Sequence, residues 1–265
     1  IPRVKDVETM IKLLESMGSK VKVSKNKNSL AIINDKKIKT EASYNLMSTM
    51  RAGIIVLGPL LARFGKARVS SPGGCNIGFR PIDIHLEALK KMGVKYKIID
   101  GYINANAKNG LVGAKIKFPK ISVGATENLM IAACLAKGQT VLSNCAIEPE
   151  IKDLSNFLCS IGAKIVWTGR RQVKIVGVKT FKQSNYKIMF DRIEAGTMLI
   201  AGAINQGNLK ITGIESSILK TEIDLLKKIG AKINQKKNEI TIKGNKKIKN
   251  INIKTSPFPG VATDI

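Results

Sequence analysis

The chain of 265 residues contains an internal repeat, and this repeat limits the folds that it can adopt. Each copy is an apolar helical pattern that ends in a hydrophobe–Gly pair, followed by a Lys-rich strand pattern, a turn and a second strand pattern. Glycine ends a helix well because it enters the left-handed backbone region without a side-chain clash. The pattern therefore predicts four helix–strand–strand copies, whose pivotal glycines are Gly18, Gly93, Gly162 and Gly230.

A second repeated element lies between these copies. It consists of a helix rich in small apolar residues, a glycine and a strand, and it reads MRAGIIVLGPLLARFGKARVS, GATENLMIAACLAKGQTVLSN and EAGTMLIAGAINQGNLKITG. These helices are apolar almost all round, which is typical of buried helices, whereas the helices before the pivotal glycines carry one charged face. We therefore expect the first kind inside and the second kind toward solvent.

Together the two elements predict an α/β fold made of units of about 70 residues, with sheets outside and helices within. No unit can bury its faces alone, so several must associate around a common axis. Three units would complete one pseudo-threefold domain, and the fourth would begin another. We place the boundary near Lys187–Asp191, ahead of the DRIEAGT segment.

The formal net charge of +26 suggests nucleic acid as a partner, but its distribution weakens that interpretation. The positive charge is mostly Lys scattered through every segment, and aromatic residues make up only 5% of the chain, so base-stacking surfaces are scarce. A Lys-rich solvated surface is the simpler explanation, and attraction of an anionic substrate is compatible with it. No apolar run approaches the length of a membrane span.

The four cysteines form no CxxC pair and there is one histidine, so we expect no metal site. Cys134 and Cys159 lie in apolar helical stretches and are expected to be small buried hydrophobes. Sparse unpaired cysteines suit a reducing, cytoplasmic location. Both ends of the sequence look cut, because the chain begins with Ile1 and ends in Thr263-Asp264-Ile265.

The segment RVSSPGGCNIGFRPIDIH, from Arg68 to His85, is the candidate chemical centre. Three glycines in six residues permit tight backbone and close approach to a ligand. Arg68 and Arg80 would favour the thiolate form of Cys75, which makes its sulfur a nucleophile or a tuned acid. From the residues alone, an incidental cysteine on a surface loop is an equal alternative.

This segment resembles the catalytic loop of the UDP-N-acetylglucosamine enolpyruvyl transferases, PGGCxIGxRPxDxH. The resemblance continues through TMRAGIIVLGPLLARFG, ISVGATENLM, DRIEAGT and TSPFPGVATDI and covers essentially the whole chain. It implies two inverse α/β domains of barrel-like form, each built from repeated βαβαββ units. It also implies a reaction: the enolpyruvyl group of phosphoenolpyruvate moves to the sugar 3-hydroxyl and phosphate leaves, an early step of peptidoglycan biosynthesis. No metal or organic cofactor is implied.

The resemblance also implies roles for individual residues. Cys75 matches the general acid toward phosphoenolpyruvate, and Asp264 matches the carboxylate beside the sugar 3-hydroxyl. Arg51 and Arg80 match arginines that hold substrate anions, which a planar guanidinium does well. The uridine strip corresponds to Arg80, Pro81, Ile82, Asp83 and Ile84. The diphosphate-binding turn corresponds to Lys120, Ile121, Ser122 and Val123, just before a helix start that offers free N–H groups. We expect His85 to be structural or a satisfied hydrogen-bonding group rather than a base.

The resemblance further implies that the chain is truncated. Residues 1–189 would form the first domain with the Cys75 loop, and residues 190–265 would form part of the second. A catalytic lysine before Ile1 and several later arginines would be absent, so we expect the fragment itself to be poorly active. Two other interpretations stay open: a nucleic-acid-binding repeat protein, and a paralogue that binds the sugar nucleotide without turnover.

Overall fold

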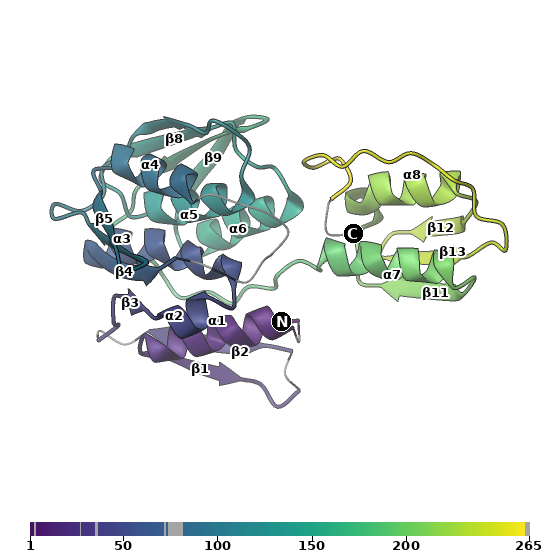
Figure 1. Cartoon of the computed structure of the whole chain (residues 1–265), viewed down its shortest axis with the longest axis horizontal. Coiled ribbons are helices and arrows are strands. Elements are labelled where there is room, and N and C mark those ends of the chain that lie inside the picture. Colours follow the sequence, from purple (N-terminus) through teal and green to yellow (C-terminus); the bar gives the residue numbers. More distant parts are fainter. Residues whose placement is uncertain (3, 27, 35–36, 72, 74–81, 263–265) are drawn as a thin grey trace. The chain divides into compact units, whose positions relative to one another are not determined.

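The computed structural model describes residues 1–262 apart from residues 3, 27, 35–36, 72 and 74–81 (Figure 1). The chain forms two compact units. Unit 1 comprises residues 1–146 and 154–186, and unit 2 comprises residues 147–153 and 187–265. None of the helices in the described part of the chain is both long and apolar enough to cross a bilayer.

Unit 1 opens with one helix and one hairpin and continues with two copies of a βαβαββ arrangement. The opening elements are α1 (Lys5–Ser16), β1 (Ser19–Val23) and β2 (Leu30–Asn34), and β1 pairs antiparallel with β2. The first full copy comprises β3 (Glu41–Ala42), α2 (Tyr44–Met47), η1 (Arg51–Val56), α3 (Leu57–Phe64), β4 (Lys66–Ser70), α4 (Asp83–Lys91), β5 (Lys95–Ile99) and β6 (Tyr102–Asn106). The second comprises β7 (Lys115–Lys117), α5 (Val123–Ala133), β8 (Gln139–Ser143), α6 (Pro149–Ser160), β9 (Lys164–Gly169) and β10 (Gln172–Val176), with α6 beginning in unit 2.

The two full copies have the same sheet topology. Their strand orders are β3-β4-β6-β5 and β7-β8-β10-β9. In each, the first two strands are parallel and joined through buried helices, and the last two form an antiparallel hairpin. In Figure 1 the strands of unit 1 lie toward its periphery, with α3 and α5 between them.

Unit 2 holds one further copy among the described residues, without an initial strand. Its elements are α7 (Arg192–Ile204), β11 (Asn208–Thr212), η2 (Ser216–Leu219), α8 (Lys220–Lys228), β12 (Lys232–Lys236) and β13 (Glu239–Lys243), and the strand order is β11-β13-β12. Its core packs α7 and α8 on this sheet through Leu199, Leu219, Ile223, Ile240 and Ile242.

The predicted repeat is confirmed at its pivotal glycines. Gly18, Gly93, Gly162 and Gly230 follow α1, α4, α6 and α8 and have φ of +106°, +92°, +104° and +103°. This backbone region is strained for residues with a side chain, so glycine is required at the turn from each helix into its hairpin.

The predicted burial of the second helix type is also confirmed. Helix α5 buries seven of its eleven residues, among them Leu129 and Met130, and α3 buries Leu57, Leu60 and Leu61. The two helices approach so closely that a Cβ on Gly58 would lie 2.2 Å from Oδ1 of Asn128 and 3.1 Å from Cβ of Ala132.

Two expectations are wrong in detail. The segment from Met50 to Gly65 is not one helix, because a 3₁₀ turn over residues 51–56 precedes α3. Pro59 has no N–H to continue an α-helical ladder through this point. Cys159 is exposed rather than buried, because α6 buries the stripe formed by Ile151, Ser155 and Leu158 and Cys159 lies on its flank. Cys134 is fully buried, as expected.

We predict that Gly58→Ala destabilises the protein by roughly 1–3 kcal/mol, because the new methyl group overlaps Asn128. The loss should appear although alanine favours helices over glycine. Gly169→Ala is the matched control, because its new Cβ would meet only Cβ of Gln172 at an ordinary 3.7 Å. Urea denaturation measures both variants, and equal stabilities would contradict the tight α3–α5 contact.

The start of α7 gives a second prediction. Oδ1 of Asp191 accepts hydrogen bonds from the N–H groups of Ile193 at 2.8 Å and Glu194 at 3.1 Å, so Asp191 is the N-cap. Asp191→Ala should lower the free energy of unfolding by about 1 kcal/mol, whereas Asp191→Asn, which keeps an accepting oxygen, should change it little. If both variants lose the same free energy of unfolding, the negative charge of Asp191 rather than its capping hydrogen bonds stabilises the start of α7.

Candidate functional site

Three helix starts converge in unit 1 around the side chain of His85. Arg51 begins η1, Asp83 begins α4 and Val123 begins α5. The ring of His85 faces the start of α5, with Cε1 at 3.5 Å and Nε2 at 3.7 Å from where a Cβ on Gly124 would be. The charges of Arg51 and Asp83 both act on the imidazole. These elements bring together residues that are far apart in the sequence.

The start of α5 is fixed by two side chains. Ser122 is the N-cap, and its Oγ accepts a hydrogen bond from Ala125 N–H at 3.3 Å. The buried hydroxyl of Thr126 donates to the Ser122 carbonyl at 2.7 Å and accepts from Ala146 N–H at 3.1 Å. The first N–H groups of a helix have no partner within it and carry its positive end. Residues 121–124 are half-buried, so these N–H groups form a rigid donor set for an anion.

The buried amide of Asn128 connects three elements. Its Oδ1 accepts a hydrogen bond from Gly58 N–H at 2.8 Å, and its Nδ2 donates to the Ile54 carbonyl at 3.1 Å. Nδ2 also lies 3.0 Å from Nδ1 of His85. Gly58 and Ile54 are four residues apart, so the side chain of Asn128 takes the place of one helical hydrogen bond at the junction of η1 and α3.

His85 is held in its neutral form. Burial lowers the pKa of its imidazole to about 4, and the charge of Arg51 adds to this effect while Asp83 opposes it. His85 as a residue is only 6% exposed. A neutral imidazole does not act as an acid at neutral pH, and its Nδ1 is already engaged by Asn128. The structure therefore agrees with a hydrogen-bonding role for His85.

The structure locates most of the predicted binding residues. Arg51, Ile82, Asp83 and the stretch from Lys120 to Val123 lie at the three convergent starts or directly before them. Ile84 is buried, so its side chain belongs to the core and only its backbone is available to a ligand. Lys120 is exposed. Cys75, Arg80, Pro81 and Asp264 lie outside the described residues.

Two observations bear on the cysteine hypothesis. Arg68, which was expected to assist Cys75, forms an ion pair with Glu41, and its Cζ atom lies 3.8 Å from the centroid of the Tyr102 ring. Burial raises the pKa of the Cys134 thiol to about 12, and its Sγ donates to the Met130 carbonyl, so this thiol is unreactive. Among the described residues there is no cluster of His, Cys, Asp or Glu that could hold a metal ion.

Sequence reasoning missed Asn128. The only signal was a polar residue on a helix that is otherwise apolar almost all round, in the stretch VGATENLMIAA. A buried amide must have hydrogen-bonding partners, so its position predicts a structural or functional contact. Its partners in α3 and α4 are set by the fold and could not be named from sequence.

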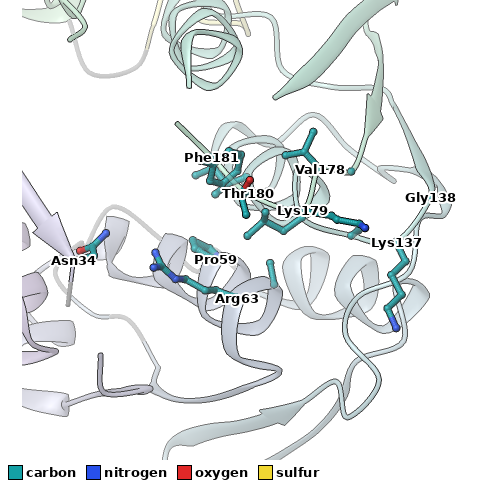
Figure 2. Close-up of a pocket in the computed structure, with 14 residues that line it drawn as sticks. Asn34, Pro59, Arg63, Lys137, Gly138, Val178, Lys179, Thr180 and Phe181 are labelled. Carbon is teal, nitrogen blue, oxygen red and sulfur yellow. The ribbon is translucent and has the colours of Figure 1, made fainter. Parts of the chain in front are cut away.

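A separate pocket of about 960 Å³ lies at the other end of α5. Figure 2 shows Pro59 and Arg63 of α3 on one side of it and the segment from Val178 to Phe181 on the other. Its cationic side chains, Arg63, Lys137 and Lys179, are exposed. Since the lining residues of α5 belong to its C-terminal part, this pocket is distinct from the convergent helix starts.

Comparison with known proteins identifies what this arrangement resembles. The family model of EPSP synthase (3-phosphoshikimate 1-carboxyvinyltransferase) matches residues 1–265. The UDP-N-acetylglucosamine 1-carboxyvinyltransferases of Pelagibacter ubique and Trichlorobacter lovleyi are 67% and 45% identical to the chain over 265 residues. Each match covers all of this chain and 63% of the relative, so the chain spans less than two thirds of their length.

Solved structures show the fold. The enolpyruvyl transferase NikO from Streptomyces tendae matches with a TM-score of 0.85 and 20% identity, over 99% of this chain and 62% of that one. An EPSP synthase from Acinetobacter baumannii matches with a TM-score of 0.70 and 16% identity, over 95% and 59%. The enolpyruvyl transferase fold expected from the sequence, with its repeated α/β units, is confirmed.

The pKa of His85 predicts a pH dependence of stability. Because the folded pKa of about 4 lies below the ordinary histidine pKa of 6.5, the unfolded chain binds a proton more readily between these values. This contribution to stability is present above about pH 6.5 and is lost as pH falls through 4. Wild type should lose on the order of 2–3 kcal/mol more than His85→Gln between pH 7 and pH 4. Urea denaturation at both pH values measures this, and parallel losses would contradict a depressed pKa.

Proposed function

Because the chain belongs to the EPSP synthase family over its whole length, we propose that it is part of an enzyme that transfers an enolpyruvyl group from phosphoenolpyruvate to the 3-hydroxyl of UDP-N-acetylglucosamine. UDP-N-acetylglucosamine is proposed as the acceptor because a relative named for that sugar nucleotide is 67% identical to the chain over all 265 residues. The reaction releases phosphate and is an early step of peptidoglycan biosynthesis.

The start of α5 supports a diphosphate-binding role. We propose that the N–H groups at Val123 and Gly124 receive the diphosphate, that Lys120 adds a positive charge and that Arg51 holds a further substrate anion. Asp83 and the backbone of Ile82 and Ile84 would contact the uridine. The rigid capping of α5 means that these donors need little rearrangement on binding.

The chemical step is assigned to residues outside the described part of the chain. We propose that the thiol of Cys75 delivers a proton to the methylene carbon of phosphoenolpyruvate as the sugar 3-oxygen bonds to its neighbouring carbon. Asp264 would accept the hydroxyl proton. Loss of a proton from the methyl group then accompanies cleavage of the bond to phosphate, which restores the double bond. Arg80 and Pro81 would join the substrate contacts beside Cys75.

We also propose that residues 1–189 form one domain and residues 190–265 part of a second. The division of the chain near residue 187 supports this proposal. Residues 147–153 cluster with unit 2, where Arg192 forms a two-pronged ion pair with Glu150 at 3.1 and 3.2 Å.

Activity and alkylation test the role of Cys75. The full-length gene product, given phosphoenolpyruvate and UDP-N-acetylglucosamine, should release phosphate and form the enolpyruvyl sugar nucleotide, as measured by mass spectrometry. The phosphonate epoxide fosfomycin should alkylate Cys75, because an epoxide reacts with a thiolate. Cys75→Asp should stay active, because a carboxyl group is also an acid, and should resist fosfomycin. Cys75→Ser should be inactive.

Each contrary outcome removes a specific part of the proposal. A fully active Cys75→Ser enzyme would exclude the acid role, and alkylation at another cysteine would exclude the reactive thiol. Binding of the sugar nucleotide without any turnover would favour a non-catalytic paralogue. A salt-dependent gel shift with RNA or DNA, without sugar-nucleotide binding, would favour the nucleic-acid alternative.

A further inference from the structure

The hydrogen bonds of Asn128 determine the tautomer of His85. Gly58 N–H can only donate and the Ile54 carbonyl can only accept, so these two backbone groups fix which end of the Asn128 side chain is oxygen and which is nitrogen. The nitrogen end faces Nδ1 of His85 at 3.0 Å. Because that nitrogen donates, Nδ1 must accept, and the proton of the neutral ring is on Nε2.

The Nε2–H group is placed at the start of α5. Nε2 lies 3.7 Å from where a Cβ on Gly124 would be, and His85 as a residue is only 6% exposed. Among the described residues, no hydrogen-bond acceptor is paired with Nε2, although Nδ1 is paired. A donor on a buried residue that has no paired acceptor and lies beside the positive end of a helix is an observation independent of the helix start itself, and both features favour an anion.

The surrounding charges keep the ring from becoming a second cation. Arg51, at the start of η1, disfavours a positive imidazole, whereas Asp83, on α4 itself, favours one. Protonation would also place an Nδ1–H against the donating amide of Asn128 on α5. With Nδ1 accepting and Nε2 donating, the ring supplies one directed hydrogen bond and transfers no proton.

We propose that Asn128 is a positioning residue that holds His85 as the Nε2–H tautomer, so that this N–H joins the α5 start in binding the diphosphate of a sugar nucleotide. The proposal rests on the proposed function for the identity of the ligand. The tautomer itself can be measured without any ligand.

The tautomer test uses the full-length gene product, in which the His85→Gln variant identifies the signals of His85, the one histidine of these 265 residues. With ¹⁵N-labelled histidine, the imidazole nitrogens should report an unprotonated Nδ1 and a protonated Nε2 throughout neutral pH. The ring should titrate only near pH 4. A protonated Nδ1 in the neutral ring, or an ordinary titration near 6.5, would overturn the proposal.

The role of Asn128 is tested with Asn128→Asp in the full-length gene product. A carboxylate at this position accepts from Nδ1–H, so at pH 8.5 the neutral ring should turn its bare Nε2 toward the ligand. Calorimetric affinity for UDP-N-acetylglucosamine should then fall about tenfold, the value of one hydrogen bond to a charged group. Affinity should recover at lower pH, where the ring carries both protons, whereas wild-type affinity should stay flat.

Asn104→Asp is the matched control. The Asn104 side chain in β6 donates to the Tyr102 carbonyl at 3.2 Å, so this variant makes the same chemical change away from the convergent starts. It should show the flat wild-type profile. A tautomer change in Asn128→Asp with unchanged affinity at pH 8.5 would overturn the proposal, because a purely structural amide predicts no pH-dependent binding.

Two variants of His85 keep the proposal testable if Asn128→Asp fails to fold. His85→Gln places an amide N–H near the position of Nε2, and His85→Asn keeps only an acceptor near Nδ1. We expect His85→Gln to bind within about threefold of wild type and His85→Asn about tenfold more weakly. The reverse order would assign His85 a structural role only.

The two proposals fail in different ways. If the wild-type protein binds neither UDP-N-acetylglucosamine nor inorganic pyrophosphate, the proposed substrate and the ligand role of Nε2–H are both wrong. If the wild-type protein binds and turns over the sugar nucleotide but the free ring carries its proton on Nδ1, only the positioning role of Asn128 is wrong.

Discussion

The side chain of Asn128 stands in for the hydrogen bond that an unbroken helix would form between Gly58 N–H and the Ile54 carbonyl. The Ile54 carbonyl also accepts a hydrogen bond from Leu57 N–H, so the group that relies on Asn128 at the junction of η1 and α3 is Gly58 N–H, whose loss of a partner would cost about 1–3 kcal/mol. The same amide requires α3 and α5 to approach closely, and that approach requires glycine at position 58. Packing, backbone geometry and the state of the His85 ring therefore depend on one buried side chain.

The repeated unit explains why this side chain lies beside helix starts. In both full copies a buried helix joins two parallel strands, and a second helix leads into an antiparallel hairpin. Helices α4 and α5 come from successive copies, and each carries a group that reaches the other: the ring of His85 and the amide of Asn128. The scaffold thus places the first N–H groups of α5 and the ring of His85 side by side, while the helices themselves stay within the core.

The sequence predicted those parts of the fold that a periodic pattern records. The four pivotal glycines were identifiable because a left-handed residue after an apolar helix leaves a local signal. Pro59 gave a local signal for the break between the 3₁₀ turn at residues 51–56 and α3, but the partner of Gly58 N–H at this break was not predictable, because Asn128 is 70 residues away in the sequence. Cys159 was misjudged because two apolar neighbours do not reveal which side of α6 faces the core. Likewise, the lone histidine was visible in the sequence, but its neutral state depends on burial, Arg51 and Asn128 together.

The surface lysines and the hydrogen-bond donors of the candidate site would act on an anion at different distances. The lysines that give the formal charge of +26 are mostly exposed, so salt at physiological concentration screens them beyond about 8 Å. They attract many anions and distinguish few of them. The capped start of α5 and the buried ring of His85 are oriented before a ligand arrives and are partly shielded from solvent. Since a directed neutral N–H binds an anion only at the correct position, these groups would supply selectivity in the proposed site, and the surface lysines would supply long-range attraction.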